Sequence, residues 1–232
     1  GNMKMKICKM RVKNYRGIKD SGWLRFDKMN AIVGKNDAGK SAVLHAINAF
    51  YNENKLLEED RYFGAGDVHA VIEIIVDGEQ LVDVPTVLLD SDGKLHIKKY
   101  ATRVGENYKN TIIVRDFGNV SYKNILQLTS SRYTSLFRGF GLNVPETFDK
   151  DNLYVLISHL LVQETDYVIE EHEIKSAILK GILKELYPQY SLFSADTSLD
   201  TGASTFQNQF KKIITNAIEA HIEEFSNLQE KV

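Results

Sequence analysis

The chain has 232 residues, 43% of them hydrophobic and 26% charged, and its formal net charge at pH 7 is −2. This balance is typical of a globular domain, and it excludes a global basic field that would recruit nucleic acid. The single cysteine, Cys8, excludes an intrachain disulfide and is typical of a reducing cytosol. No apolar run approaches the length of a membrane span, so we expect a cytoplasmic protein without a membrane partner.

Three strands are expected ahead of residue 34. Residues 4–13 alternate, with apolar side chains pointing one way and basic side chains the other, as in a half-buried strand. Residues 14–17, Asn-Tyr-Arg-Gly, follow as a turn, and residues 23–26 begin a second strand. The short apolar run at 29–33 is typical of a buried third strand.

Residues 34–41 read GKNDAGKS, which is the G-x-x-x-x-G-K-[ST] pattern of a P-loop. The glycines let the backbone curl round a polyphosphate, and the amides from about Asp37 to Ser41 would form an anion nest at a helix N-terminus. Lys40 is expected to reach the β- and γ-phosphates of ATP, and the Ser41 hydroxyl to ligate Mg²⁺. Apolar residues at helical spacing over 41–51 complete the order of strand, loop and helix. The residues predicted here to bind nucleotide are Gly34, Asn36, Asp37, Ala38, Gly39, Lys40, Ser41 and Ala42.

From residue 68 the apolar pattern keeps a period of two, which predicts strands. The run at 71–76 leads into Asp77-Gly78, a strong hairpin signal, and the run at 84–89 precedes a second turn at 90–93. Two more strands are expected over 95–103 and 110–115. The segment is therefore predicted to be an antiparallel meander with no helices between its strands, within a mixed α/β fold that carries α+β elements.

The second half of the chain changes to helical spacing. Helices are expected within 121–140, over 152–163 and over 174–186, where Pro188 ends the last one. A short strand is expected over 190–196. The segment from about Thr205 is predicted to form one long helix. Its apolar repeat is typical either of a coiled coil or of an amphipathic helix that packs on its own domain.

The beginning of the chain resembles a known family. The run K-N-Y-R-G at 13–17, an amphipathic strand and N-A-I-V-G-K-N-D-A-G-K-S at 30–41 resemble the start of RecF/SMC-type ABC ATPases. The nearest branch is the overcoming-lysogenization-defect (OLD) type, often described as ATP-dependent endonucleases or AAA-family ATPases. The resemblance implies a P-loop NTPase with an ABC-ATPase-like half-core, an antiparallel β lobe and a C-terminal helical segment. It also implies a role in DNA repair, DNA processing or phage defence, with homodimers that sandwich ATP between two heads, and it leaves DNA open as a partner.

The resemblance also assigns residues and parts. By position, Arg16 approaches the phosphates, although it is equally well interpreted as a surface arginine that braces its turn. Asn36 matches the G-x-N-x-x-G-K-[ST] form of the family, and Asp196 ends a strand where the family places its Q-loop, as a metal or water contact. The implied parts are a P-loop lobe over 3–120, a helical part of the same head over 121–204, and the start of a helical insertion over 205–232.

Two motifs that hydrolysis needs are not found in the sequence. No S-G-G signature occurs, and the nearest candidate for a Walker B carboxylate is Asp77, which we interpret as a hairpin residue. The catalytic residues are therefore left unassigned and are expected beyond Val232, in a longer protein. We expect the chain by itself to bind ATP but to hydrolyse it hardly above background.

Other P-loop classes fit less well. A GTPase would carry N-K-x-D to read guanine, and the chain has only a D-x-x-G at 90–93. A P-loop kinase needs a largely parallel sheet, which the predicted meander opposes. A non-catalytic, nucleotide-gated dimerisation module remains open.

Basic residues with interleaved tyrosines gather between positions 94 and 115. They form either a track for nucleic-acid phosphates or the solvated face of an antiparallel lobe, and we favour the second interpretation. The basic members are Lys94, Lys98, Lys99, Arg103, Lys109 and Arg115, and the tyrosines are Tyr100 and Tyr108.

Overall fold

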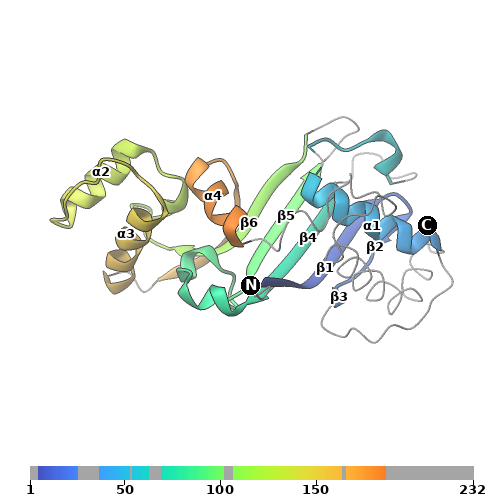
Figure 1. The fold of residues 1–232 in the computed structure, drawn as a ribbon, viewed down its shortest axis with the longest axis horizontal. Coiled ribbons are helices and arrows are strands. Elements are labelled where there is room, and N and C mark those ends of the chain that lie inside the picture. The colour runs from blue at the N-terminus through green and yellow to red at the C-terminus, as the bar shows by residue number, and fades with distance from the viewer. Residues whose placement is uncertain are drawn as a thin grey trace, which may run out of the picture. The chain divides into compact units, whose positions relative to one another are not determined.

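The computed structural model describes residues 5–25, 37–52, 54–62, 69–101, 107–163 and 166–186 (Figure 1). Its tertiary contacts divide the chain into two compact units. The first, here called the P-loop unit, comprises Lys6–Val76, Ile97–Asn110 and Pro188–Val232. The second, here called the helical unit, comprises Gly1–Met5, Asp77–His96 and Thr111–Tyr187. Each unit is considered by itself.

The described strands form one sheet in the order β2-β1-β4-β5-β6-β7, with β3 also paired to β1. β1 pairs antiparallel with β2 and with β3, and β6 pairs antiparallel with β7. Strands β4, β5 and β6 are neighbours in both sequence and space, which is the order predicted for the meander. The bounds are β1 Met5–Tyr15, β2 Ile18–Asp20, β3 Leu24–Arg25, β4 Ala70–Gly78, β5 Leu95–Ala101, β6 Lys109–Phe117 and β7 Tyr167–Glu173.

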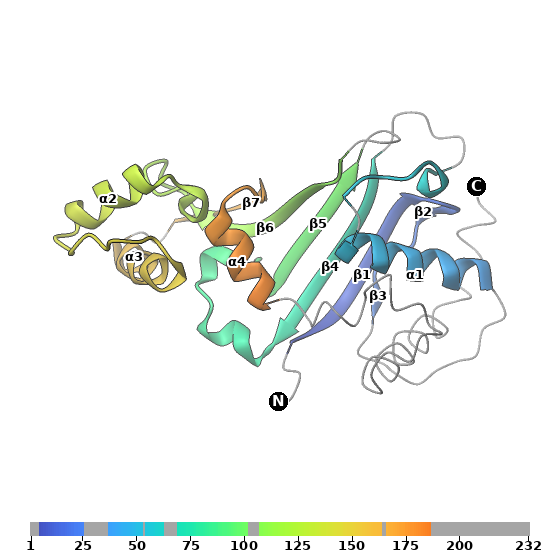
Figure 2. The same cartoon turned by 45° about the horizontal axis from the view of Figure 1, so that its top comes forward.

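The core of the P-loop unit lies between its strands and helix α1, Asp37–Asn52. Met10 and Val12 of β1 are fully buried, as the alternating pattern predicts. α1 lies across β1, β2 and β3 (Figure 2) and buries Ile47 and Phe50. A short 3₁₀ helix, η1 at Glu58–Asp60, follows α1 in the chain.

The helical unit combines strand segments with α2 Ser130–Gly139, α3 Lys150–Gln163 and α4 Ala177–Leu186. α4 contacts both α3 and the 3₁₀ helix η4, Ile125–Gln127. Tyr133 is buried among these elements, and its hydroxyl donates to the Ile125 carbonyl at 2.8 Å. Burial raises the pKa of Tyr133 to about 12, so the ring is an uncharged member of this core.

The connection between β4 and β5 differs from the predicted hairpin and strand. It forms two 3₁₀ helices, η2 at Glu79–Asp83 and η3 at Thr86–Leu88. Val87, Leu88 and Leu89 are buried in succession, whereas a half-buried strand buries every second residue. Pro85 also lacks the amide that a central strand would need. The consecutive apolar residues Val87, Leu88 and Leu89 therefore belong to a buried turn and not to a strand.

The second half of the chain contains a strand that the sequence did not predict. β7 follows α3 and pairs with β6 over seven residues, from Thr111↔Glu173 to Phe117↔Tyr167. Its sequence, YVIEEHE, alternates poorly and is rich in acidic residues, which hides it from pattern analysis. α3 and α4 confirm the predicted helices, although α4 begins at Ala177, three residues later than expected.

Some predicted elements lie outside the described residues, namely the strands at 29–33 and 190–196 and the long helix from Thr205. Within the described part of the chain, no helix is both long and apolar enough to cross a membrane.

Candidate nucleotide-binding site

The second half of the P-loop motif forms the first turns of α1. The helix begins at Asp37, so the motif passes from loop to helix inside its own sequence. The first four amides of an α-helix have no acceptor within the helix, so they can donate hydrogen bonds to an anion. In α1 these are the amides of Asp37, Ala38, Gly39 and Lys40. Ala42 is buried, so of this residue only the backbone is suited to a nucleotide contact. Gly34 and Asn36 lie outside the described residues.

Arg16 lies in the turn between β1 and β2 and is held by Asp60 of η1. Its amide donates to the Asp60 carbonyl at 2.7 Å, and its Nε donates to Asp60 Oδ1 at 3.0 Å. Nη2 reaches the same carboxylate oxygen at 2.8 Å. Arg16 has a positive φ of 52°, a conformation that costs a non-glycine residue energy unless contacts hold it. The contacts to Asp60 supply that restraint, so the arginine does brace its turn.

Asp60 is a site residue that sequence reasoning missed. It is only 2% exposed, while the Arg16 side chain is 26% exposed. A buried carboxylate needs a cation and hydrogen bonds to offset its desolvation, and Arg16 provides both. In the sequence Asp60 is the last member of an acidic run, Glu-Glu-Asp, which by itself indicates only a solvated loop. The Arg16–Asp60 pair leaves about a quarter of the arginine accessible.

The charges of the Arg16–Asp60 pair affect the pKa of His45 in α1. His45 is one helical turn beyond Ser41, and burial lowers the pKa of its imidazole. The positive charge of Arg16 lowers that pKa further, while the Asp60 and Glu59 carboxylates oppose the shift. The charges of Arg16 and Asp60 thus act on a residue of α1, the helix that carries the P-loop lysine and serine.

The C-terminal end of α1 is held by Lys99 of β5. Its Nζ donates to the carbonyls of Ala49 and Phe50 at 2.9 and 3.0 Å, and it lies 5.2 Å from the centroid of the Tyr108 ring. α1 has no basic residue in its last turn, so β5 supplies the cation that the helix dipole favours there. The lysine therefore anchors the end of α1 that is remote from the phosphate-binding loop.

The same contacts correct one detail of the basic stripe between positions 94 and 115. Lys99 is 4% exposed, so it belongs neither to a solvated face nor to a track for phosphates. Lys94 pairs with Asp77, and Arg115 donates to the Ser91 carbonyl at 3.0 Å. Lys109 is exposed, and Arg103 lies outside the described residues. The stripe is thus divided between internal contacts and surface positions.

The two acidic candidates from the sequence have different outcomes. Asp77 lies near the end of β4, where its Oδ1 accepts the Gly78 amide at 2.8 Å and its Oδ2 pairs with Lys94 Nζ at 2.8 Å. This carboxylate is committed to neighbouring groups, as expected of a turn residue and not of a metal-organising one. Asp196 lies outside the described residues.

A P-loop that opens a helix packed on a sheet defines the class of P-loop NTPases. The chain belongs to the AAA ATPase domain family, whose model matches residues 5–232. Members of this family use ATP, usually with Mg²⁺, which agrees with the nucleotide and metal predicted from the motif. A search of curated proteins finds no match to the chain.

Proposed function

We propose that this protein is the ATP-binding head of a RecF/SMC/OLD-like ATPase that acts in DNA repair, DNA processing or phage defence. The observation that carries the proposal is the P-loop at 34–41, whose second half forms the first turns of α1. Membership of the AAA ATPase family supports ATP binding. The RecF/SMC/OLD branch is supported by the resemblance over residues 4–51, in which K-N-Y-R-G precedes the P-loop.

The described contacts fit a polyphosphate held at the start of α1. The amides of Asp37 to Lys40 would receive phosphate oxygens, Lys40 would neutralise the β- and γ-phosphates, and Ser41 would complete the shell of Mg²⁺. Arg16 would add a second cation from the β1–β2 turn, oriented by Asp60. Lys99 would keep α1 from shifting along its axis by holding the carbonyls at its other end.

The proposal is tested by titrating Mg-ATP into the chain in a calorimeter. Lys40→Ala removes the charge that meets the β- and γ-phosphates, and a charge-assisted contact of about 1.5–3 kcal/mol corresponds to roughly ten- to hundredfold weaker binding. The matched control is Lys109→Ala, which removes an exposed lysine from β6. Equal affinities for Lys40→Ala and the wild type would contradict the proposal, provided that both variants keep the wild-type circular dichroism.

A second candidate function is a nucleotide-gated dimerisation module without hydrolysis. The observation that favours it is Asp77, the nearest sequence candidate for a catalytic carboxylate, which is engaged by Lys94 and the Gly78 amide. In this case ATP would join two heads, each covering the nucleotide of the other. Sedimentation with and without ATP measures the pairing, and phosphate release measures turnover. Dimers without turnover favour the module, whereas turnover that Lys40→Ala abolishes favours the ATPase.

A further inference from the structure

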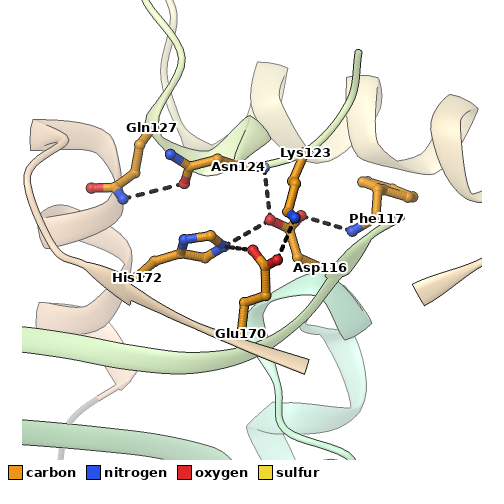
Figure 3. Close-up of polar contacts among 7 residues, drawn as sticks. All are labelled: Asp116, Phe117, Lys123, Asn124, Gln127, Glu170 and His172. Atoms are coloured by element: carbon orange, nitrogen blue, oxygen red, sulfur yellow. Dashed lines mark hydrogen bonds and ion pairs between the residues drawn. The ribbon is translucent and has the colours of Figure 1, made fainter. Parts of the chain in front are cut away.

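Three side chains with metal-ligating atoms gather on neighbouring strands of the helical unit (Figure 3). Asp116 comes from β6, and Glu170 and His172 come from β7. In the register of this antiparallel pair Asp116 is opposite Val168, which shares its strand face with Glu170 and His172. All three side chains therefore project from one face of the sheet. Their ligand atoms lie within 4.8 Å of one another.

Asp116 is fixed before any ligand arrives. The residue is 2% exposed, and its Oδ1 accepts the Phe117 amide at 2.7 Å. Its Oδ2 accepts the Asn124 amide at 2.7 Å and lies 2.7 Å from His172 Nε2. Backbone amides that hold a carboxylate in place are the usual outer support of a ligand, since they set its direction without occupying all of its lone pairs.

The remaining contacts give the cluster two carboxylates and one permanent cation. Lys123 Nζ pairs with Glu170 Oε1, and His172 Nε2 lies 3.6 Å from Glu170 Oε2. A neutral imidazole leaves one negative charge uncompensated among these four groups. The Lys123 side chain is 35% exposed, so its ammonium can move into solvent and release Glu170.

We propose that Asp116, Glu170 and His172 form a binding site for a divalent transition-metal ion of the Zn²⁺ type. One imidazole nitrogen and two carboxylate oxygens are a ligand set that such ions accept. The ion binds Nε2 of the neutral His172 imidazole, whose single ring proton then stands on Nδ1, so metal–ligand bonds to Nε2 and to Asp116 Oδ2 replace the hydrogen bond between these two atoms. Lys123 leaves Glu170, whose Oε2 completes the set, and water fills the remaining coordination. The separations among the ligand atoms require movements of about an ångström.

The bound ion would join parts of the chain that are distant in sequence. β7 follows α3, whereas Asp116 precedes the segment that carries Asn124 and η4. A metal bound to both strands would strengthen the attachment of β7 to β6 beyond their backbone ladder. This site is independent of the proposed ATP function, because none of its residues belongs to the P-loop unit.

The proposal is tested by equilibrium dialysis of the full chain against Zn²⁺ in the absence of nucleotide. We expect the wild type to bind one equivalent of zinc, and we expect His172→Gln and Asp116→Asn to lose this binding. The matched control is His96→Gln, because His96 Nδ1 lies 3.9 Å from Asp90 Oδ2 but the pair has no third such ligand among the described residues. Co²⁺ gives a second readout, as visible absorption that is present in the wild type and His96→Gln and lost in His172→Gln.

Lys123→Met keeps the test decisive if the ligand variants fail to fold. It retains all three ligands and removes the ammonium that competes for Glu170, so zinc should bind about tenfold more tightly. Zinc binding that is unchanged in His172→Gln would overturn the proposal. A wild-type affinity in folded Lys123→Met, or the absence of the equivalent from the wild type, would overturn it as well.

Discussion

Asp60 of the P-loop unit and Asp116 of the helical unit are both only 2% exposed, yet they are neutralised in different ways. Asp60 faces Arg16, whose guanidinium keeps its charge at any pH that a protein tolerates. Asp116 faces two backbone amides and the imidazole of His172, whose hydrogen bond a metal–ligand bond can replace. A permanent partner commits a carboxylate to orienting a neighbour, whereas a replaceable partner leaves it able to accept a ligand.

The environments of the two aspartates explain why one pair braces a turn and the other forms a cluster. Arg16 and Asp60 share backbone and side-chain contacts, so the guanidinium and the β1–β2 turn are held together. Asp116 is oriented by two backbone amides and the imidazole of His172, and the side chains of His172 and Lys123 each retain some exposure. The desolvation of a carboxylate is thus offset in both places, but only at Asp116 can a metal ion replace the side-chain partner.

The largest effect is expected from removing the permanent pair. Asp60→Ala leaves the largely enclosed Arg16 without its partner, and unfolding in urea should show a loss of about 3 kcal/mol. The control is Asp20→Ala, which breaks the pair of Arg11 with an aspartate whose side chain is 38% exposed. That loss should stay below about 1 kcal/mol. Equal losses of unfolding free energy in Asp60→Ala and Asp20→Ala would show that the contribution of each ion pair does not depend on the burial of its aspartate.

An intermediate effect is expected at Lys99, a buried cation that faces carbonyl dipoles and an aromatic ring in place of a carboxylate. Lys99→Met preserves the aliphatic stem but removes two charge-assisted hydrogen bonds to α1, which should cost about 2 kcal/mol of unfolding free energy. Lys98→Met, at the neighbouring partly exposed position, should cost less than about 0.5 kcal/mol. A similar change in both variants would mean that the end of α1 does not depend on Lys99.

The smallest effect is a pH dependence at His45, where burial and then Arg16 lower the imidazole pKa from 6.5. The unfolded chain therefore binds this proton more readily than the folded chain. Stability from this group is complete above about pH 6.5 and is lost as the pH falls through that value towards the lower folded pKa. His45→Gln should flatten this part of the urea midpoint profile, and an NMR titration of the ring follows the pKa directly.

A variant of Asp60 gives a second test by the same NMR titration, because the charge of Asp60 raises the pKa of His45 while that of Arg16 lowers it. In Asp60→Asn the imidazole should titrate at a lower pH than in the wild type, since only the arginine charge remains. A pKa that moves upward in this variant would contradict the assignment of Arg16 and Asp60 as neighbours of α1.

Local sequence patterns determined the P-loop, the helix that it opens, the alternation of β1 and the helix at 152–163. Each rests on residues a few positions apart, whose spacing fixes a helical or strand face whatever the rest of the chain does. Local patterns did not predict the burial of Asp60 and Lys99 or the strand β7. Their burial and pairing come from segments far away in sequence, which a local window does not include.

The sequence by itself established a P-loop opening a helix, followed by strands in meander order, because turn glycines and a period of two act over short distances. Only the tertiary structure decided the partners of the buried charges. Arg16 and Asp60 are 44 residues apart, Lys99 and Ala49 are 50 apart, and Asp116 and His172 are 56 apart. Strand register and helix placement bring each pair together, and shifting β7 by one residue would turn His172 to the opposite face from Asp116.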